Sequence, residues 1–185
     1  MDSFIKLMDG YIGKFVCDSG GIYKGQCPQW IKEIVQIVGC AWPGKTGNGN
    51  QVLDTMVNEY GGYWGKPKYD YRLCSADNKY DSNGHCWLEL KIGDTWYRYE
   101  QNVNNDGAKS ADFGCGKVYS VTKTSKALPS YLYNIRYAGH PSVDYYIEVY
   151  NKKKEDNDKD TMPDWFKKWA QDLANYISKS TKEAK

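Results

Sequence analysis

The chain has 185 residues, and its 25 basic and 23 acidic side chains give a formal net charge of +2. A chain of this length buries enough apolar surface to fold without metal or disulfide support, which excludes a mini-protein scaffold. The near balance of charge excludes nucleic acid and anionic membranes as expected partners, since both require a concentrated basic surface. No apolar run approaches the roughly 20 residues that span a bilayer, so we expect no membrane span.

The N-terminal segment, residues 1–9, lacks the basic start and the uninterrupted apolar run of a Sec signal peptide. We therefore expect synthesis in the cytosol, a reducing compartment in which the six cysteines remain free thiols. The sequence contains no Cys-x-x-Cys and no His-x-x-x-His, which argues against a zinc site. The cysteines and histidines of this sequence therefore indicate no required cofactor.

Apolar residues at helical spacing predict three helices near the N-terminus, at 3–12, 28–38 and 51–60. Beyond residue 68, aromatic and β-branched residues predict six strands, at 69–73, 85–92, 95–101, 117–122, 131–137 and 143–150. Helices followed by antiparallel strands indicate the α+β class, with N-terminal helices packed on an antiparallel β-sheet.

The density of charge rises near residue 151, where Asn151-Lys152-Lys153-Lys154-Glu155-Asp156 predicts a solvated linker. We expect residues 1–150 to form the main domain, and residues 151–185 to add this charged linker and an amphipathic C-terminal helix. The apolar stripe of that helix is formed by Trp165, Phe166, Trp169, Leu173, Tyr176 and Ile177.

The segment 156–167 resembles the Asp-x-Asp-x-Asp calcium loops of extracellular calcium-binding repeats. Carboxylates at four loop positions would supply the hard oxygen ligands that calcium prefers, namely Asp156, Asp158, Asp160 and Asp164. Thr161 replaces the usual glycine and Lys167 replaces the usual bidentate glutamate. A solvated acidic linker is therefore an equal alternative to a calcium site.

The segment Ile92-Gly93-Asp94-Thr95 predicts a two-residue type II′ turn between two alternating runs. This turn sets a register in which Glu89 faces Arg98, an opposite-charge pair that supports the assignment. Alternate side chains on each strand then share one face of the sheet. Cys86 and its alternate neighbours point to the other face.

The same register places His85 across from Asn102 and diagonally from Glu100, while Trp87 faces Glu100. A carboxylate or amide beside an imidazole fixes its tautomer and stabilises its protonated form, as a general base requires. The alternative is a surface strand with ordinary polar residues.

Cys27 differs from the other cysteines because it follows a glycine-rich loop and directly precedes Pro28 at a predicted helix start. Unpaired amides and the helix dipole at this position favour a thiolate and lower the pKa of the thiol. A thiolate paired with an imidazole can attack a carbonyl carbon, with backbone amides stabilising the oxyanion. For Cys40 and Cys86 we expect the ordinary role of buried apolar residues.

Four motifs in chain order then carry a resemblance: Gly25-Gln26-Cys27-Pro28-Gln29-Trp30, Gly49-Asn50, Gly84-His85 and Glu100-Gln101-Asn102. Together they resemble the CHAP family (cysteine, histidine-dependent amidohydrolases/peptidases) over residues 15–150. The resemblance implies a papain-like fold and cleavage of bacterial peptidoglycan. The bond cut would be the amide between muramic acid and the peptide stem, as in an N-acetylmuramoyl-L-alanine amidase, or a peptide bond within the stem or cross-bridge.

The resemblance also implies roles for individual residues. Cys27 would be the nucleophile, His85 the general base and then acid, Glu100 the orienting carboxylate and Asn102 a further polar partner. Tryptophans near these motifs are candidates to line a substrate groove, and with Gln26 the candidates for substrate binding are Trp30 and Trp87, with Trp64 and Trp96 as further groove residues.

Two alternatives remain open. The run His85-Cys86-Trp87-Leu88-Glu89, followed by Trp96 and Glu100, also resembles transglutaminase-like enzymes, which apply the same chemistry to acyl transfer. The other alternative is a non-catalytic module for wall binding or virion structure. The leading expectation is a phage-lysin type of peptidoglycan hydrolase, released through holin pores or carried on a virion, with calcium as its one candidate ion.

Overall fold

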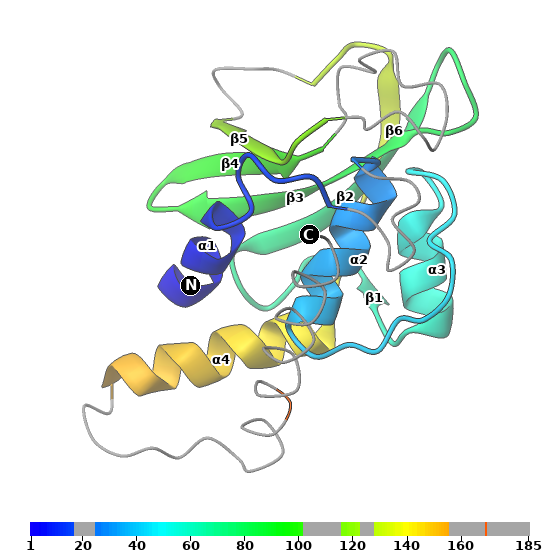
Figure 1. The fold of residues 1–185 in the computed structure, drawn as a ribbon. Helices are drawn as coiled ribbons and strands as arrows, with labels where there is room; N and C mark the ends of the chain where they lie inside the picture. The colour runs from blue at the N-terminus through cyan, green and yellow to red at the C-terminus, as the bar shows by residue number, and fades with distance from the viewer. Residues whose placement is uncertain (17–24, 102–115, 123–127, 156–168, 170–185) are drawn as a thin grey trace, which may run out of the picture. The chain divides into compact units, whose positions relative to one another are not determined.

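The computed structural model describes residues 1–16, 25–101, 116–122, 128–155 and 169 (Figure 1). The chain divides into two compact units, Met1–Asn151 and Lys152–Lys185. In chain order the elements are α1 (Asp2–Asp9), α2 (Cys27–Ile37), α3 (Val52–Glu59), β1 (Tyr63–Trp64), β2 (Tyr71–Asn78), β3 (His85–Ile92), β4 (Thr95–Glu100), β5 (Tyr119–Thr122), β6 (Leu132–Gly139) and α4 (Pro141–Glu155). The three predicted N-terminal helices are confirmed within a few residues at each end. None of the helices in these ranges is long and apolar enough to cross a membrane.

The strands form one antiparallel sheet in the order β1-β6-β2-β3-β4-β5. This sheet, together with the helices, confirms the α+β class. The β3–β4 hairpin has the predicted register, in which Glu89 pairs with Arg98 and Trp87 pairs with Glu100. Gly93 has φ of 59° in the turn, a backbone conformation that the first position of a type II′ turn requires and that glycine adopts without strain.

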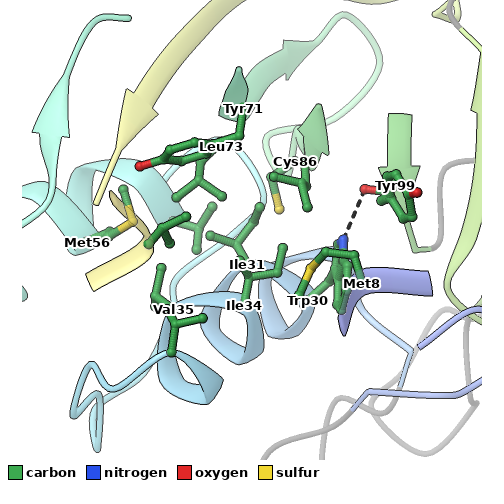
Figure 2. Close-up of a cluster of buried hydrophobic side chains, with 14 of the residues drawn as sticks. Met8, Trp30, Ile31, Ile34, Val35, Met56, Tyr71, Leu73, Cys86 and Tyr99 are labelled. Atoms are coloured by element: carbon green, nitrogen blue, oxygen red, sulfur yellow. Dashed lines mark hydrogen bonds between the residues drawn. The ribbon is translucent and has the colours of Figure 1, made fainter. Parts of the chain in front are cut away.

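Helix α2 packs against one face of the sheet through apolar side chains repeated at helical spacing. Figure 1 shows α1 and α2 on this same face. Figure 2 shows the resulting core, in which Trp30, Ile31, Ile34 and Val35 of α2 meet side chains of the sheet and other helices, among them Met8, Met56, Tyr71, Leu73 and Cys86. Each fully buried large apolar side chain contributes about 1.5–3 kcal/mol, so this interface holds α2 firmly in place.

The opposite face of the central strands is also covered. Trp87 and Cys74 pack there against Leu132, with Leu128 and Tyr131 beside them. His85 is only 4% exposed on this covered sheet, and Glu100 is fully buried. The alternative of an ordinary polar surface strand is therefore wrong for β3.

The predicted strand at 143–150 is wrong, because this segment is part of α4. Its β-branched and aromatic residues favour a strand locally, but Val143 and Ile147, four residues apart, are both fully buried and so define a helical stripe. Pro141 stands at the first helical position, where it costs no hydrogen bond. Tertiary burial of that stripe outweighs local preference. The short strand β1 was not predicted, because two residues carry no periodic signal.

Helix α4 begins at a cap made by His140. The ring Nδ1 of His140 accepts a hydrogen bond from the amide of Ser142 at 3.1 Å, and its Nε2 lies 2.9 Å from the carbonyl oxygen of Tyr60. The carbonyl of His140 also accepts from Val143. His140 therefore has a structural role as a helix cap, outside the Cys27 site.

Candidate active site

Cys27 and His85 meet where the start of α2 contacts the start of β3. Gly49 marks the meeting point, because a β-carbon built on it would lie 3.1 Å from Cys27 Sγ and 2.9 Å from the Cα of His85. A side chain at this position would push the thiol and the histidine strand apart. Close packing at the site therefore explains why the Gly49-Asn50 motif has a glycine at position 49.

The imidazole of His85 is oriented by the carboxylate of Glu100. Nε2 of His85 lies 3.2 Å from Oε2 of Glu100. The second carboxylate oxygen accepts from Arg98 Nε at 3.0 Å and from the Tyr119 hydroxyl at 2.7 Å. Because Glu100 occupies Nε2, the other ring nitrogen, Nδ1, is left to face the Cys27 thiol.

The electrostatics of the site favour a thiolate and an imidazolium. A hydrogen bond from Cys86 contributes most to lowering the pKa of Cys27; burial opposes this, and the charge and hydrogen bond of His85 lower it further. Burial by itself would lower the pKa of His85, but the Cys27 charge and hydrogen bond, together with Glu100, raise it to about 9. Burial likewise opposes ionisation of Glu100, yet contact with His85 and Arg98 lowers its pKa overall. These contacts therefore favour the thiolate–imidazolium form of the pair.

Cys86 has a more specific position than that of a buried apolar residue. It follows His85 on β3, points to the helical face of the sheet and is fully buried (Figure 2). Burial is the main cause that raises the pKa of Cys86, and the neighbouring Cys27 raises it further. The protonated Cys86 thiol therefore donates to the Cys27 thiolate.

Two tryptophans expected to bind substrate have other roles. Trp87 is fully buried, with its ring stacked on His85 at a centroid distance of 5.7 Å and its Nε1 donating to Glu89 at 3.1 Å. Trp30 is also fully buried and donates from Nε1 to the carbonyl of Tyr99 at 3.0 Å (Figure 2). The prediction that these rings contact substrate is corrected: Trp87 fixes the plane of the imidazole, and Trp30 fastens α2 to β4.

Gln101 is a residue of the site that sequence reasoning missed. Its fully buried amide nitrogen donates to the carbonyl of Gln26 at 2.9 Å and to the carbonyl of Val16 at 3.2 Å, while its oxygen accepts from the Val16 amide at 2.9 Å. Gln26 itself is half-buried and is the N-cap residue of α2. Gln101 therefore ties the backbone just before Cys27 to the end of β4. Its place between Glu100 and Asn102 was the available signal.

The remaining predicted site residues lie outside the described ranges: Asn102, and the candidate calcium ligands Asp156, Asp158, Asp160 and Asp164. The role of Gln26 in substrate binding stays a prediction. Within the ranges that the structure describes, no group of three or more histidine, cysteine or acidic side chains is placed to hold a metal ion.

The arrangement can perform nucleophilic acyl chemistry, because a thiolate, an imidazolium and an orienting carboxylate follow one another in contact. The nucleophile lies at the first turn of a helix, where unpaired backbone N–H groups can bind a developing oxyanion. Comparison of the chain with protein-family models, with curated proteins and with solved structures finds no match.

Proposed function

We propose that the protein is a cysteine hydrolase on a papain-like frame that cleaves an amide bond of bacterial peptidoglycan. The observation that carries the proposal is the contact between Cys27 at the start of α2 and a buried imidazole held by Glu100. The four motifs that resemble the CHAP family supply the choice of substrate. Each of the four motifs contributes a residue to this site, namely Cys27, Gly49, His85 and Glu100.

The mechanism follows from the positions of these groups. The Cys27 thiolate attacks the carbonyl carbon of the scissile amide, and amide N–H groups at the start of α2 stabilise the oxyanion. The His85 imidazolium gives its proton to the leaving nitrogen, which departs as an amine and leaves a thioester on Cys27. His85 then takes a proton from water, which attacks the thioester; the acyl group leaves as a carboxylic acid, and the Cys27 thiolate and the His85 imidazolium are restored. Glu100 keeps the imidazole oriented throughout.

The first test is lysis of purified cell walls, followed as a loss of turbidity. Cys27→Ala removes the nucleophile, and we expect the rate to fall by about 10³-fold or more. Cys40→Ala is the matched control, because Cys40 is a half-buried thiol that follows the C-terminal end of α2, and its loss should leave the rate unchanged. Equal lysis by wild type and Cys27→Ala would exclude Cys27 from the mechanism.

Mass spectrometry of the digested walls identifies the bond, since new N-termini distinguish an amidase from an endopeptidase. Isopeptide products from glutamine and amine donors without lysis would replace hydrolysis with acyl transfer, the transglutaminase-like alternative. Wall binding that is unaffected by Cys27→Ala, together with no labelling of Cys27 by iodoacetamide at neutral pH, would indicate a non-catalytic module.

A further inference from the structure

A concave surface lies at the edge of the sheet formed by β1, β6 and β2. It is a groove of about 480 Å³. Its lining consists of aromatic, aliphatic and basic side chains and contains no carboxylate: Trp64, Gly65, Lys66, Arg72, Ile135, Arg136 and Tyr137. None of these residues belongs to the Cys27 site, so we call this surface the β1–β6 groove.

The guanidinium of Arg72 is held in the groove by two aromatic rings. It lies 4.2 Å from the ring centroid of Trp96 and 5.2 Å from that of Tyr137. Within the described ranges its one ion pair is with Glu89 at 3.6 Å, which is longer than a hydrogen bond. Among the described residues its guanidinium makes no hydrogen bond. The rings therefore fix the plane of the guanidinium and leave N–H groups free to donate.

The other two cations of the groove differ in how they are compensated. Arg136 donates to Asp54 at 2.9 Å, donates to the carbonyl of Asn50, and lies 5.2 Å from the ring of Trp64. Lys66 is exposed and has no ion-pair or hydrogen-bond partner in the part of the chain that the structure describes. The groove therefore retains an uncompensated positive charge beside the oriented Arg72.

The groove is close to the nucleophile through one loop. Arg136 bonds to the carbonyl of Asn50, and the preceding residue, Gly49, packs against Cys27 and His85. A ligand in the groove would thus lie one backbone segment away from the scissile bond. This proximity suits a substrate that is held at two points.

We propose that the β1–β6 groove binds a carboxylate-bearing peptide, namely an acidic segment of the peptidoglycan stem; this identity rests on the proposed function. A planar guanidinium recognises a carboxylate through paired N–H donors, and the Lys66 ammonium adds a second charge. Trp64, which is 43% exposed, and Ile135 supply apolar walls for the aliphatic part of the peptide. A neutral glycan would use the tryptophan but leave the Lys66 ammonium without a partner.

Binding of two synthetic peptides to the full chain tests this inference independently of catalysis. The probes are N-acetyl-Ala-Glu-Ala-amide and its Gln analogue, and binding is followed by NMR shifts of the tryptophan indole N–H groups. We expect the Glu peptide to bind about fivefold or more tightly and to lose affinity as salt rises. Equal affinity for the two peptides, or preferential binding of chitotetraose, would overturn the proposal.

Substitutions locate the site. Lys66→Gln should weaken binding of the Glu peptide about fivefold, whereas Lys68→Gln, two residues away and paired with Glu148, should not. Arg72→Lys keeps the charge paired with Glu89 but removes the planar donor, so we expect weaker binding with an unchanged melting temperature. Unaltered binding by both Lys66→Gln and Arg72→Lys would contradict the assignment.

Cell-wall lysis separates this inference from the proposed function. With an active enzyme, Lys66→Gln should raise KM and leave kcat unchanged, because the groove lies outside the reacting groups. Lysis without selective binding of the Glu peptide would refute the groove and leave the proposed function standing. Selective peptide binding without lysis would refute the proposed function and leave an acidic-peptide site.

Discussion

His85 owes its chemistry to two neighbours that favour its protonated form and to burial, which opposes that form. Glu100 at Nε2 favours the charged ring, the Cys27 thiolate favours it as well, and burial of the ring opposes both. The balance raises the pKa of His85 to about 9. The proposed hydrolase activity should therefore be lost on the alkaline side as the imidazolium loses its proton near that pH.

Glu100→Gln tests this origin of the alkaline limb. The amide keeps the size of the side chain but removes the charge that stabilises the imidazolium, so the limb in kcat/KM should move to lower pH by about one unit or more. The pH dependence of kcat/KM and of iodoacetamide labelling at Cys27 measures the shift. Glu148→Gln, a surface carboxylate, is the control. An unmoved limb would show that Glu100 does not set the pKa of His85.

At the scale of elements, Gln101 joins the end of β4 to the backbone that enters α2. Gln101→Leu removes its hydrogen bonds to Gln26 and Val16, which should destabilise the fold by about 1–3 kcal/mol. Because the Cys27 amide loses its fixed position, we also expect kcat to fall more than KM changes. Urea unfolding and wall-lysis kinetics measure the two effects.

Gln36→Leu is the matched control for Gln101. Gln36 lies on α2, the helix that Gln101 anchors, and donates to the carbonyl of Trp42 at 3.1 Å, away from the thiol. The Gln36→Leu variant should be less stable than wild type but should show no selective loss of kcat. If both variants reduce kcat equally, Gln101 supports only the fold. Partial recovery of kcat in Gln101→Glu, which keeps the acceptor for Val16, would support the positioning role.

The His140 cap at the start of α4 should make the folding stability of the protein depend on pH. The contacts of His140 with Ser142 and Tyr60 fit the neutral ring, and burial lowers the pKa of His140. These contacts therefore contribute fully to folding stability above about pH 6.5, the pKa of histidine in the unfolded chain. Their contribution is lost as the pH falls through the lower pKa of His140 in the folded protein.

His140→Asn tests this cap. Asparagine also caps helices but does not titrate, so the variant should lose less stability than wild type between pH 7 and 5. Urea unfolding across this range measures the difference, and His140→Ala should be less stable than His140→Asn at pH 7. Identical pH dependence of wild type and His140→Asn would contradict the role.

Sequence patterns predict the elements whose signals are local. The β3–β4 register depends on Gly93 and its turn, and the start of α2 depends on Pro28, so both are confirmed. The burial and the hydrogen-bond partners of other site residues depend on long-range packing, which local sequence patterns do not reveal. Nothing near Trp30 or Trp87 in sequence reveals that both rings are buried, and the amide of Gln101 finds partners 75 and 85 residues away.

At the scale of the main unit, the sheet separates two kinds of interior. One face is an apolar core against the helices, and the other holds a chain of charges that includes Arg72, Glu89, Arg98 and Glu100. Buried charges are costly unless each is paired, so loss of one member leaves another uncompensated. The polar face thus couples the orientation of His85 to the integrity of the whole sheet.

The β3–β4 hairpin has a consequence for how the site assembles. His85 and Glu100 are 15 residues apart and belong to one hairpin, so their contact has low contact order and can form early. Cys27 joins them only when α2 docks, a non-local event in the folding sequence. Partial release of α2 would separate the thiol from an intact His85–Glu100 pair, so thiol reactivity reports the docked fraction of that helix.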